Sequence, residues 1–486
     1  MRAPLVLTAV ILLSLAVPVS AAVEHITDCR GPFNPLEDPD TVYILDNDIT
    51  SGITDMCMVI TAENITLDCN GHEIKEEVPF TAIYSEAESS TIRGCNVDMK
   101  SQTNLPAIKL VGANNSYLYN NTAVFNNMGI YVVNSSNVTL EKNTVQQNFM
   151  GMTISGGSGN MVLNNTIMVN FIIMIPGGSF GVGLAMVGTT GNIVHGNDIL
   201  LNPYNMQEVG CSGNNITGNT FYGFPNLMNS YGISMSSTSS DLVMGNTFYK
   251  HLNTAMNAEE SDHNVFRGNN LTMNLIGFYL KSGSDSNTIT DNLINRSRSA
   301  VMLSSSTGNI VESNIIPSCT GSFCVSLANS DGNMLSLGSG LSYSGNYVLY
   351  LQGSNNNVIY DTTLTNSGDY GIGIVQNSVN NTFLNCSYDK MTIEPGSEAV
   401  SGWYVDILVN NGTKPVQGAI VNMDNEDWTS SETTGLDGYI ARQNIVGFVK
   451  DNTSESQRTF QVIASKPGHI SDSWGPAQVT DNMVIG

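Results

Sequence analysis

The stretch Asn264-Val265-Phe266-Arg267-Gly268-Asn269-Asn270-Leu271-Thr272 decides the fold, because the rest of the chain repeats it. Counted from Asn269, another Asn lies five residues before, and the apolar Phe266 and Leu271 lie three before and two after. Period-two alternation in so short a run indicates a strand that is bent by a turn at Gly268-Asn269. Equivalent positions recur at a spacing of 22 or 23, as in Asn246, Asn269, Asn292 and Asn314.

A repeat of this length is typical of a solenoid, in which each unit buries its apolar face only by stacking on the next. Each repeat adds a second short apolar strand, such as Gly277 to Leu280, and no helical periodicity separates the strands. We therefore predict an all-β chain, a right-handed, single-stranded parallel β-helix of about 13 turns whose stacked Asn side chains form ladders at a repeat of about 4.8 Å. The first ladder is predicted to contain Asn160, Asn192, Asn214, Asp241, Asn264, Asn287, Asn309, Asn333, Asn357 and Asn381.

The amino-terminal residues predict export. Residues 1–22 hold Met1-Arg2, an apolar run from Leu5 to Val17 and small residues up to Ala22, which together predict a secretory signal peptide. The apolar run is too short for a membrane span. Residues 23–60 are predicted to cap the open end of the solenoid, and residues 61–396 to form the β-helix. We expect a secreted, extracellular or cell-surface protein without a membrane span in the mature chain.

The segment Asn64 to Ile74, NITLDCNGHEI, carries a family resemblance. Together with the Asn-ladder turns it resembles exported proteins of the NosD-like parallel β-helix group, which is common in archaea and overlaps the carbohydrate-binding and sugar-hydrolase β-helix group. The resemblance covers roughly residues 25 to 395. Because its motifs are turn and ladder residues, it implies the fold far more specifically than an activity.

Beyond residue 396 the composition changes. Trp403, Trp428 and Trp474 are the three Trp residues of the chain, and short apolar runs separated by turn residues predict strands. The runs KPVQGAIV and ASKPGHI, with a Thr-x-x-x-Gly turn between them, resemble the carboxypeptidase-regulatory-like domain. We predict a small immunoglobulin-like β-sandwich at 400–486, which the resemblance implies to be an accessory module without catalytic residues.

Charge and cysteine content bound the partners. The net charge of -24, with only 18 Lys and Arg, disfavours nucleic acid and anionic lipid. Eight Cys in an exported chain permit disulfides. The preferred pairs are Cys29 with Cys57 and Cys319 with Cys324. For Cys69 and Cys95, at equivalent places 26 residues apart, both a bond and a stack of buried thiols stay open.

Two long turns predict a binding face. The interval from Asn165 to Asn197 is 32 residues and that from Asn219 to Asn246 is 27, and both insertions fall in the same part of the turn. Solenoid insertions project from one face, which is often the binding face. Four aromatic residues at this place are predicted to form a strip for stacking a sugar ring: Phe180, Tyr204, Tyr222 and Phe224. The alternative is that the loops fold over one another as a small satellite core.

The densest set of titratable residues surrounds the repeat quoted first. The catalytic candidates are Asp262, His263, Arg267 and, one turn later, Asp285. Asp262 and Asp285 both lie seven residues before the second Asn of their turn, so we expect them to stack one strand spacing apart. Adjacent carboxylates bind a cation or shift each other's pKa values. No paired-Asp or Asp-x-Asp signature accompanies them, and this absence favours a protein without catalytic activity.

The NosD resemblance implies copper as a ligand, and copper is bound by thioether and imidazole groups. The sequence holds 22 Met and six His, but the His residues form no tight pair. Met residues such as Met152, Met244, Met302 and Met334 occupy strand positions and are predicted to fill the core. We therefore predict no metal site and no cofactor, with calcium left open and copper disfavoured.

The preferred hypothesis is an exported β-helix protein that binds carbohydrate or another envelope component without catalysis. The first alternative is a polysaccharide lyase, epimerase or glycoside hydrolase acting on acidic polysaccharide. The second is a periplasmic copper-binding accessory protein. Fold alone does not choose among these functions.

Overall fold

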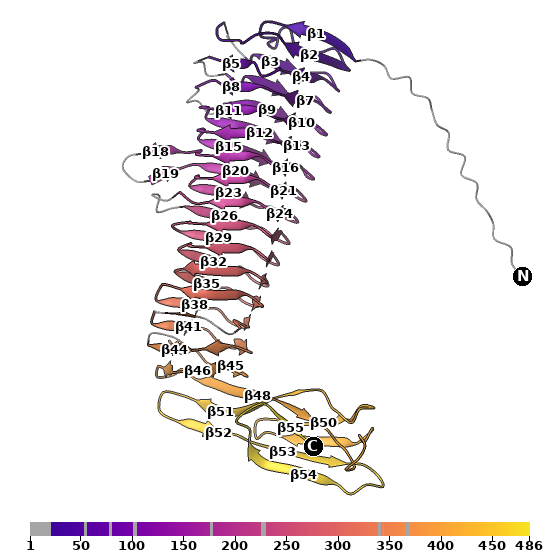
Figure 1. Ribbon diagram of the computed structural model, residues 1–486, viewed down its shortest axis with the longest axis vertical. Helices are drawn as coiled ribbons and strands as arrows, with labels where there is room; N and C mark the ends of the chain where they lie inside the picture. Colours follow the sequence, from indigo (N-terminus) through magenta and orange to yellow (C-terminus); the bar gives the residue numbers. More distant parts are fainter. Residues whose placement is uncertain are drawn as a thin grey trace, which may run out of the picture.

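The computed structural model describes residues 21–52, 56–76, 80–100, 105–174, 178–224, 230–338, 342–343, 345–365 and 369–486. The described residues form strands and turns without a helix, and so offer no helical membrane span. The predicted signal peptide lies outside them apart from Ala21 and Ala22, where the first strand begins. Figure 1 shows a tall stack of strands with a smaller β-domain below it.

Three parallel sheets run along the stack, and the chain visits sheets A, C and B in turn. Sheet A contains β1 (Ala22–Ile26), β2 (Thr41–Leu45), β4 (Thr66–Asp68), β7 (Thr91–Arg93), β10 (Tyr117–Tyr119), β13 (Thr139–Glu141), β16 (Met161–Leu163), β21 (Ile193–His195), β24 (Asn215–Thr217), β27 (Leu242–Met244), β30 (Val265–Arg267), β33 (Thr288–Thr290), β36 (Ile310–Glu312), β39 (Met334–Leu335), β42 (Val358–Tyr360) and β45 (Asn381–Leu384).

Sheet C contains β5 (Glu73–Lys75), β8 (Asn96–Asp98), β11 (Thr122–Val124), β14 (Thr144–Gln146), β17 (Thr166–Met168), β22 (Asp198–Leu200), β25 (Thr220–Tyr222), β28 (Thr247–Tyr249), β31 (Asn270–Thr272), β34 (Leu293–Ser297), β37 (Ile315–Cys319) and β40 (Ser342–Tyr343). Near the end of the stack a short pair, β43 (Thr363–Leu364) and β46 (Ser387–Tyr388), follows.

Sheet B contains β3 (Met58–Ile60), β6 (Ile83–Ser85), β9 (Pro106–Val111), β12 (Met128–Val133), β15 (Met150–Ser155), β20 (Val182–Val187), β23 (Tyr204–Val209), β26 (Tyr231–Ser236), β29 (Thr254–Glu259), β32 (Ile276–Lys281), β35 (Ser299–Ser304), β38 (Phe323–Ala328), β41 (Tyr347–Gln352), β44 (Tyr370–Val375) and β47 (Met391–Ile393).

The predicted all-β parallel solenoid is confirmed. The 15 strands of sheet B correspond to about 15 turns rather than the expected 13 or so. Part of the difference lies in residues 23–60, predicted as a cap, which contain β2 and β3 in the same parallel arrangement as the later turns.

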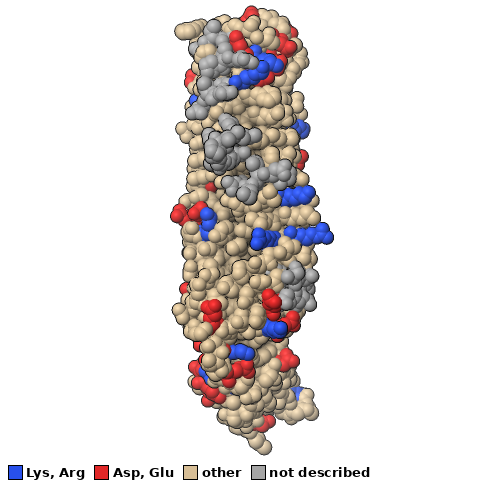
Figure 2. Space-filling model, turned by 90° about the vertical axis from the view of Figure 1, so that its left-hand side faces the viewer, with Lys and Arg blue, Asp and Glu red and all other residues tan. Residues whose placement is uncertain are grey.

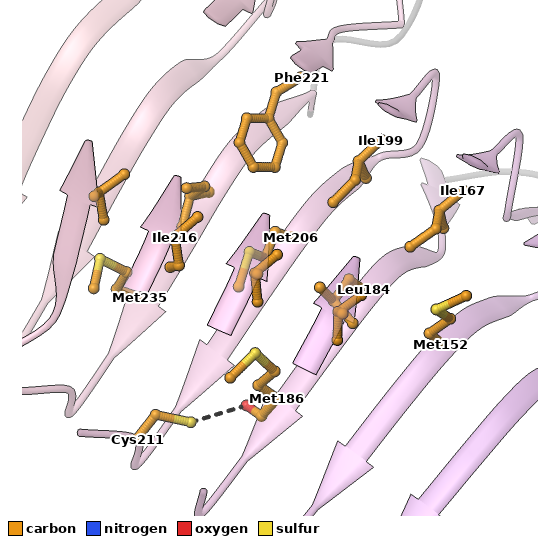
Figure 3. Packing of buried hydrophobic residues seen from close by; sticks show 14 of the residues in the cluster. Met152, Ile167, Leu184, Met186, Ile199, Met206, Cys211, Ile216, Phe221 and Met235 are labelled. Atoms are coloured by element: carbon orange, nitrogen blue, oxygen red, sulfur yellow. Dashed lines mark hydrogen bonds between the residues drawn. The ribbon is translucent and has the colours of Figure 1, made fainter. Parts of the chain in front are cut away.

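The interior is an apolar column in which one residue of each turn stacks on its equivalents. Phe221 and Phe248 stack with ring centroids 4.8 Å apart, and Phe266 is 1% exposed. Figure 3 shows Met186, Met206 and Met235 pointing into this interior, where Cys211 donates a hydrogen bond to the Met186 carbonyl. Each turn is closed by its neighbours, as a solenoid requires.

The core assignment of the Met residues was right only for Met152, which is buried. Met244 and Met334 are 40% and 44% exposed, and Met302 lies on the outer face of sheet B. Strand alternation explains the correction. The neighbouring Val243 and Leu335 point inward, so the Met side chains on either side of them point out.

Amide ladders line the interior at the corners. Asn269 is typical: its backbone N–H and its Nδ2 both donate to Asn292 Oδ1, at 2.9 and 3.0 Å, and Nδ2 also donates to the Val243 carbonyl at 2.9 Å. Such pairing satisfies polar groups that would be costly to bury unpaired. The structure adds two ladders that the sequence analysis missed: Asn126, Asn148, Asn170 and Asn202 after sheet C, and Ser306, Ser330, Ser354, Ser378 and Ser397 after sheet B.

Three disulfides tie parts of the solenoid together. They join Cys29 to Cys57, Cys69 to Cys95, and Cys319 to Cys324. The sequence left two alternatives for Cys69 and Cys95, a disulfide bond or a stack of buried thiols, and the structure has the disulfide bond. Cys211 is a buried free thiol.

The last domain is a β-sandwich. One layer contains β48 (Ala399–Ile407), β51 (Gln443–Lys450), β52 (Glu455–Gln457) and β55 (Met483–Ile485), and the other β49 (Ile420–Asp424), β50 (Thr429–Thr433), β53 (Thr459–Ser465) and β54 (Asp472–Gln478). Strand β48 belongs to both domains: its first residues pair in parallel with β45 on one side and antiparallel with β51 on the other. The sandwich therefore continues the end of the solenoid.

Candidate functional site

One outer edge of the solenoid carries the insertions and most of the partly exposed aromatic clusters. We call it the loop edge and define it as the first residues of strands β20 to β44 of sheet B, the turns that lead into them, and the last residues of the sheet C strands before those turns. In Figure 1 the hairpin of β18 (Ile172–Met174) and β19 (Gly178–Phe180) projects from this edge, and Figure 2 views the molecule from that side.

The first aromatic group lies at mid-height. Tyr204 and Tyr231 begin β23 and β26, occupy paired positions in the parallel register, and stack with centroids 4.8 Å apart and an interplanar angle of 4°. Asn253 Nδ2 donates to the Tyr231 hydroxyl at 2.7 Å, which fixes the ring from the next turn. Burial raises the pKa of Tyr204, so its hydroxyl stays protonated at neutral pH. Both rings are half-buried and rigidly placed.

The other members of the predicted strip have separate partners. Phe224 contacts Phe171 edge to face with centroids 5.3 Å apart, so the two insertions touch, as in the satellite-core alternative. Tyr222 lies at the end of β25 and contacts Tyr249, 5.4 Å away. The side chain of Phe180 lies outside the described part. The strip is thus a set of aromatic pairs on both sides of the turn, not one continuous surface.

A second aromatic group was missed by the sequence analysis. Phe323, Tyr347 and Tyr370 begin β38, β41 and β44, and Tyr350 lies beside them. The ring centroids of Phe323 and Tyr350 are 4.4 Å apart, and those of Tyr347 and Tyr370 are 5.5 Å apart. Gly373 leaves the space that two of the rings fill, since a Cβ there would lie 2.7 Å from Tyr347 and 2.8 Å from Tyr350. The 23- or 24-residue spacing of the three leading rings was the available signal.

The two groups lie on one line. Tyr204 and Tyr370 begin strands that are seven positions apart in sheet B. At a strand spacing of about 4.8 Å, the line is about 34 Å long. A row of partly exposed rings with hydroxyl groups offers apolar faces and hydrogen bonds together, as surfaces that bind amphipathic ligands do. This geometry suits an extended ligand better than a compact one.

Three of the catalytic candidates, Asp262, His263 and Asp285, lie at a different corner, after sheet B, and Arg267 ends β30 of sheet A. Asp262 Oδ1 accepts a hydrogen bond from the Asp285 backbone N–H at 2.8 Å, and Asp285 Oδ1 accepts one from Thr307 N–H at 2.6 Å. They therefore stack on successive turns and cap the backbone of the turn that follows. His263 is exposed, and Arg267 forms an ion pair with Asp291 at 3.0 Å. Asp331 and Asn355 cap later turns in the same way, which gives this carboxylate stack a structural role.

Two carboxyl groups lie buried inside the solenoid: Asp241 replaces an Asn of a ladder, and Glu208 lies among the apolar residues of the interior. Glu208 Oε1 accepts a hydrogen bond from Asn214 Nδ2 at 3.0 Å, and Asp241 Oδ1 accepts one from the Asn214 N–H at 2.6 Å. Their other oxygens are buried without a partner among the described residues. Burial, reinforced by the nearby Asp241 carboxylate, raises the pKa of Glu208 well above its usual value, and burial raises the pKa of Asp241 to about 6.

His251 interrupts the ladder after sheet C. Its ring nitrogens contact Asn205 Nδ2 at 3.1 Å and Asn274 Oδ1 at 3.0 Å. Burial lowers the pKa of His251 to about 4, so the ring is neutral at physiological pH. Although His251 lies in a turn of the loop edge, its side chain is sealed inside the solenoid like those of the acid pair.

Hollows occur elsewhere on the described surface. One of about 470 Å³ lies on the sandwich between Asn422, Thr429 and Ile463. Another of about 500 Å³ lies near the start of the solenoid and includes Asp68 and Arg93, which neutralise each other in an ion pair. Among the described residues no three His, Cys, Asp or Glu are grouped to hold a metal ion. The loop edge differs from these hollows in that it presents aligned aromatic rings and not a deep cavity.

Comparison with known proteins identifies one family and several solved structures with low similarity. The family model described as periplasmic copper-binding protein (NosD) matches residues 40–230, 225–300 and 282–389. No curated protein matches the sequence. Solved structures with similarity include the periplasmic alginate epimerase AlgG, with 11% identity over 73% of this chain and 77% of that chain and a TM-score of 0.39. The DFA-IIIase of Arthrobacter chlorophenolicus A6 has 11% identity over 62% of this chain and 85% of that chain, with a TM-score of 0.41. The Dettilon tailspike protein has 11% identity over 91% of this chain and 78% of that chain, with a TM-score of 0.39.

Proposed function

This chain belongs to the NosD family, and from that premise we propose that it is an exported envelope protein that binds carbohydrate along the loop edge without cleaving it. The observation that carries the proposal is the line of aromatic rings from Tyr204 to Tyr370. Stacked, half-buried tyrosines keep their rings in place before a ligand arrives, so little side-chain entropy is lost on binding.

Copper, which the family description names, fits the described residues poorly. The six His side chains lie on separate turns or domains, and those with resolved contacts are engaged with other groups, as in His25 with Asp46 and His195 with Thr217. Buried Met side chains, including Met186 and Met206, lie in the sealed interior. A copper site needs convergent donors with access from solvent.

The terminal sandwich has an accessory role in this proposal. We infer that it is a carboxypeptidase-regulatory-like module that closes the carboxyl end of the solenoid and spaces it from the envelope. Strand β48 supports this, because the backbone edge of β45 is covered by it and is not left open for pairing with another chain.

The test is a glycan array followed by titration of the polysaccharides that bind. Replacing Tyr231 or Tyr347 by Ala should weaken binding about tenfold, as expected for loss of an aromatic anchor. The matched control is Tyr119→Ala, since Tyr119 is also half-buried in an aromatic pair but lies on sheet A. Phe224→Ala tests the insertion in the same series.

Product analysis separates binding from catalysis. Each bound polysaccharide is incubated with the protein, with and without calcium, and examined for cleavage or epimerisation. Turnover that disappears in Asp262→Ala would replace the binding proposal by an enzyme. Binding that is unchanged in Tyr231→Ala, Tyr347→Ala and Phe224→Ala would exclude the loop edge as the site.

A further inference from the structure

Three basic side chains gather on the loop edge between its two aromatic groups. Lys250 lies in the turn before β29, Arg296 lies near the end of β34, and Arg298 lies between β34 and β35. Lys250, Met273 and Arg296 occupy equivalent left-handed positions of successive turns, with φ values of 58°, 58° and 53°. The Lys250 and Arg296 backbones are therefore two strand spacings, about 10 Å, apart.

These cations are presented to solvent. Arg296 and Arg298 are exposed, and no ion pair joins any of the three to a carboxylate among the described residues. The Lys250 ammonium lies 4.9 Å from the centre of the Tyr249 ring. A cation over an aromatic face is held in position while its charge stays available.

The surroundings lack acidic residues, although the chain as a whole is strongly acidic. No Asp or Glu occurs in the sequence segments that precede β12 to β38: residues 125–127, 147–149, 169–181, 201–203, 223–230, 250–253, 273–275, 296–298 and 320–322. Asp369 directly precedes β44, beside the second aromatic group. The chain has 42 Asp and Glu in total and a net charge of -24. Figure 2 shows Lys and Arg gathered at mid-height on one side of this face without Asp or Glu beside them.

The charge pattern decides which ligands can approach the loop edge. Acidic residues on the other corners would repel a polyanion, but at physiological salt their influence is screened beyond about 8 Å. A polyanion can therefore approach along the loop edge. Arg recognises a carboxylate with paired hydrogen bonds, and Lys supplies a point charge.

We propose that the loop edge binds an anionic polysaccharide, a chain of carboxylated sugars, with Lys250, Arg296 and Arg298 holding carboxylates between the two aromatic groups that hold sugar rings. This inference rests on the proposed carbohydrate binding and adds the class of ligand. The cations lie between the two aromatic groups along a line of about 34 Å, a length that suits an extended polymer.

The experiment compares polygalacturonate with its fully methyl-esterified form, which has the same backbone without the charge. The wild-type protein should bind polygalacturonate at least tenfold more tightly, and the difference should shrink as salt rises from 50 to 500 mM. The variant Lys250→Gln/Arg296→Gln/Arg298→Gln should lose about tenfold or more in affinity for polygalacturonate. Its affinity for the ester should be unchanged.

The matched control removes the same charge elsewhere, in Lys109→Gln/Lys414→Gln/Lys466→Gln, and should change affinity less than twofold. Circular dichroism and the melting temperature establish that both variants fold. Polyglutamate serves as a polyanion without sugar and should bind at least tenfold more weakly than polygalacturonate.

Each outcome has a distinct meaning. Equal affinity for polygalacturonate and the ester, equal damage by the control variant, or equal binding of polyglutamate would overturn the anionic-sugar inference. If a neutral glycan binds in a Tyr347-dependent manner while polygalacturonate does not, carbohydrate binding stands and the inference fails. If no carbohydrate of the array binds, both fail together.

Discussion

The interior corners and the loop edge of the same solenoid follow opposite rules. At an interior corner one residue type recurs turn after turn, as Asn269 and Asn292 do, because each side chain must hydrogen-bond to its copy in the next turn. At the loop edge the residue at one position changes from turn to turn, as in Thr254, Ile276 and Ser299. Repetition marks what holds the fold together, and departure from repetition marks what is free to bind.

The largest expected effect separates the two regions by stability. Replacing the buried Phe266 by Ala leaves a cavity beside Phe278 and should lower the free energy of unfolding by about 3 to 5 kcal/mol. Replacing the half-buried Phe323 on the loop edge should cost about 1 kcal/mol, because solvent fills the space. Urea unfolding of both variants measures the contrast, and equal losses would remove the distinction.

The next effect is at the acid pair inside the solenoid. Raised pKa values mean that the folded state keeps protons which the unfolded chain releases near 4.5 for Glu and 3.8 for Asp. The stability from this pair is present below those values and is lost as the pH rises through about 6.

Glu208 lies in register with Met186 and Met235, so Glu208→Met should fit the column. It should raise the free energy of unfolding at pH 7 by on the order of 2 kcal/mol and have little effect at pH 4. Chemical unfolding at the two pH values checks this. A variant that is less stable than the wild type at pH 7 would show that the carboxyl group supports the ladder.

His251 should have the opposite pH dependence. Its ordinary pKa of 6.5 falls to about 4 in the folded state, so its contribution is present above pH 6.5 and is lost as the pH falls toward 4. The acid pair and His251 therefore offset each other in the same pH range. In the next turn Asn274 occupies the position that His251 holds, so Asn should fit there. Without the opposing effect of His251, the His251→Asn variant should be more stable at pH 5 than at pH 7. A variant with the pH profile of the wild type would argue against this opposition.

The smallest expected effect is on the stability of the loop-edge variants. Arg296→Gln removes an exposed charge without an ion pair among the described residues and should change the free energy of unfolding by less than about 0.5 kcal/mol. Differential scanning calorimetry at neutral pH checks it. A loss above about 1 kcal/mol would mean that this arginine also supports the turn.

The repeats could be recognised in the sequence because each one depends on residues that lie close together in the chain. Asn264 and Asn269 lie a fixed distance from inward-facing apolar residues, and that pattern needs no knowledge of distant partners. Met244 was placed wrongly because it is apolar and lies in a strand, although its equivalents in the adjacent turns, Thr217 and Arg267, are polar and mark an outward position. Tyr347 was missed because it lies where the second Asn of the repeat has given way to other residues.

The sequence by itself determined the solenoid, its strands, the Asn ladders on either side of sheet A and the change to a β-sandwich near residue 396, because periodicity and turn chemistry act over a few residues. Only the tertiary structure decided which outward side chains meet. Tyr204, Arg298 and Tyr370 are far apart in the chain and come onto one line through the parallel register of sheet B. The position of a side chain along that line depends on the number of turns between residues, and insertions change the sequence spacing without changing the turn count.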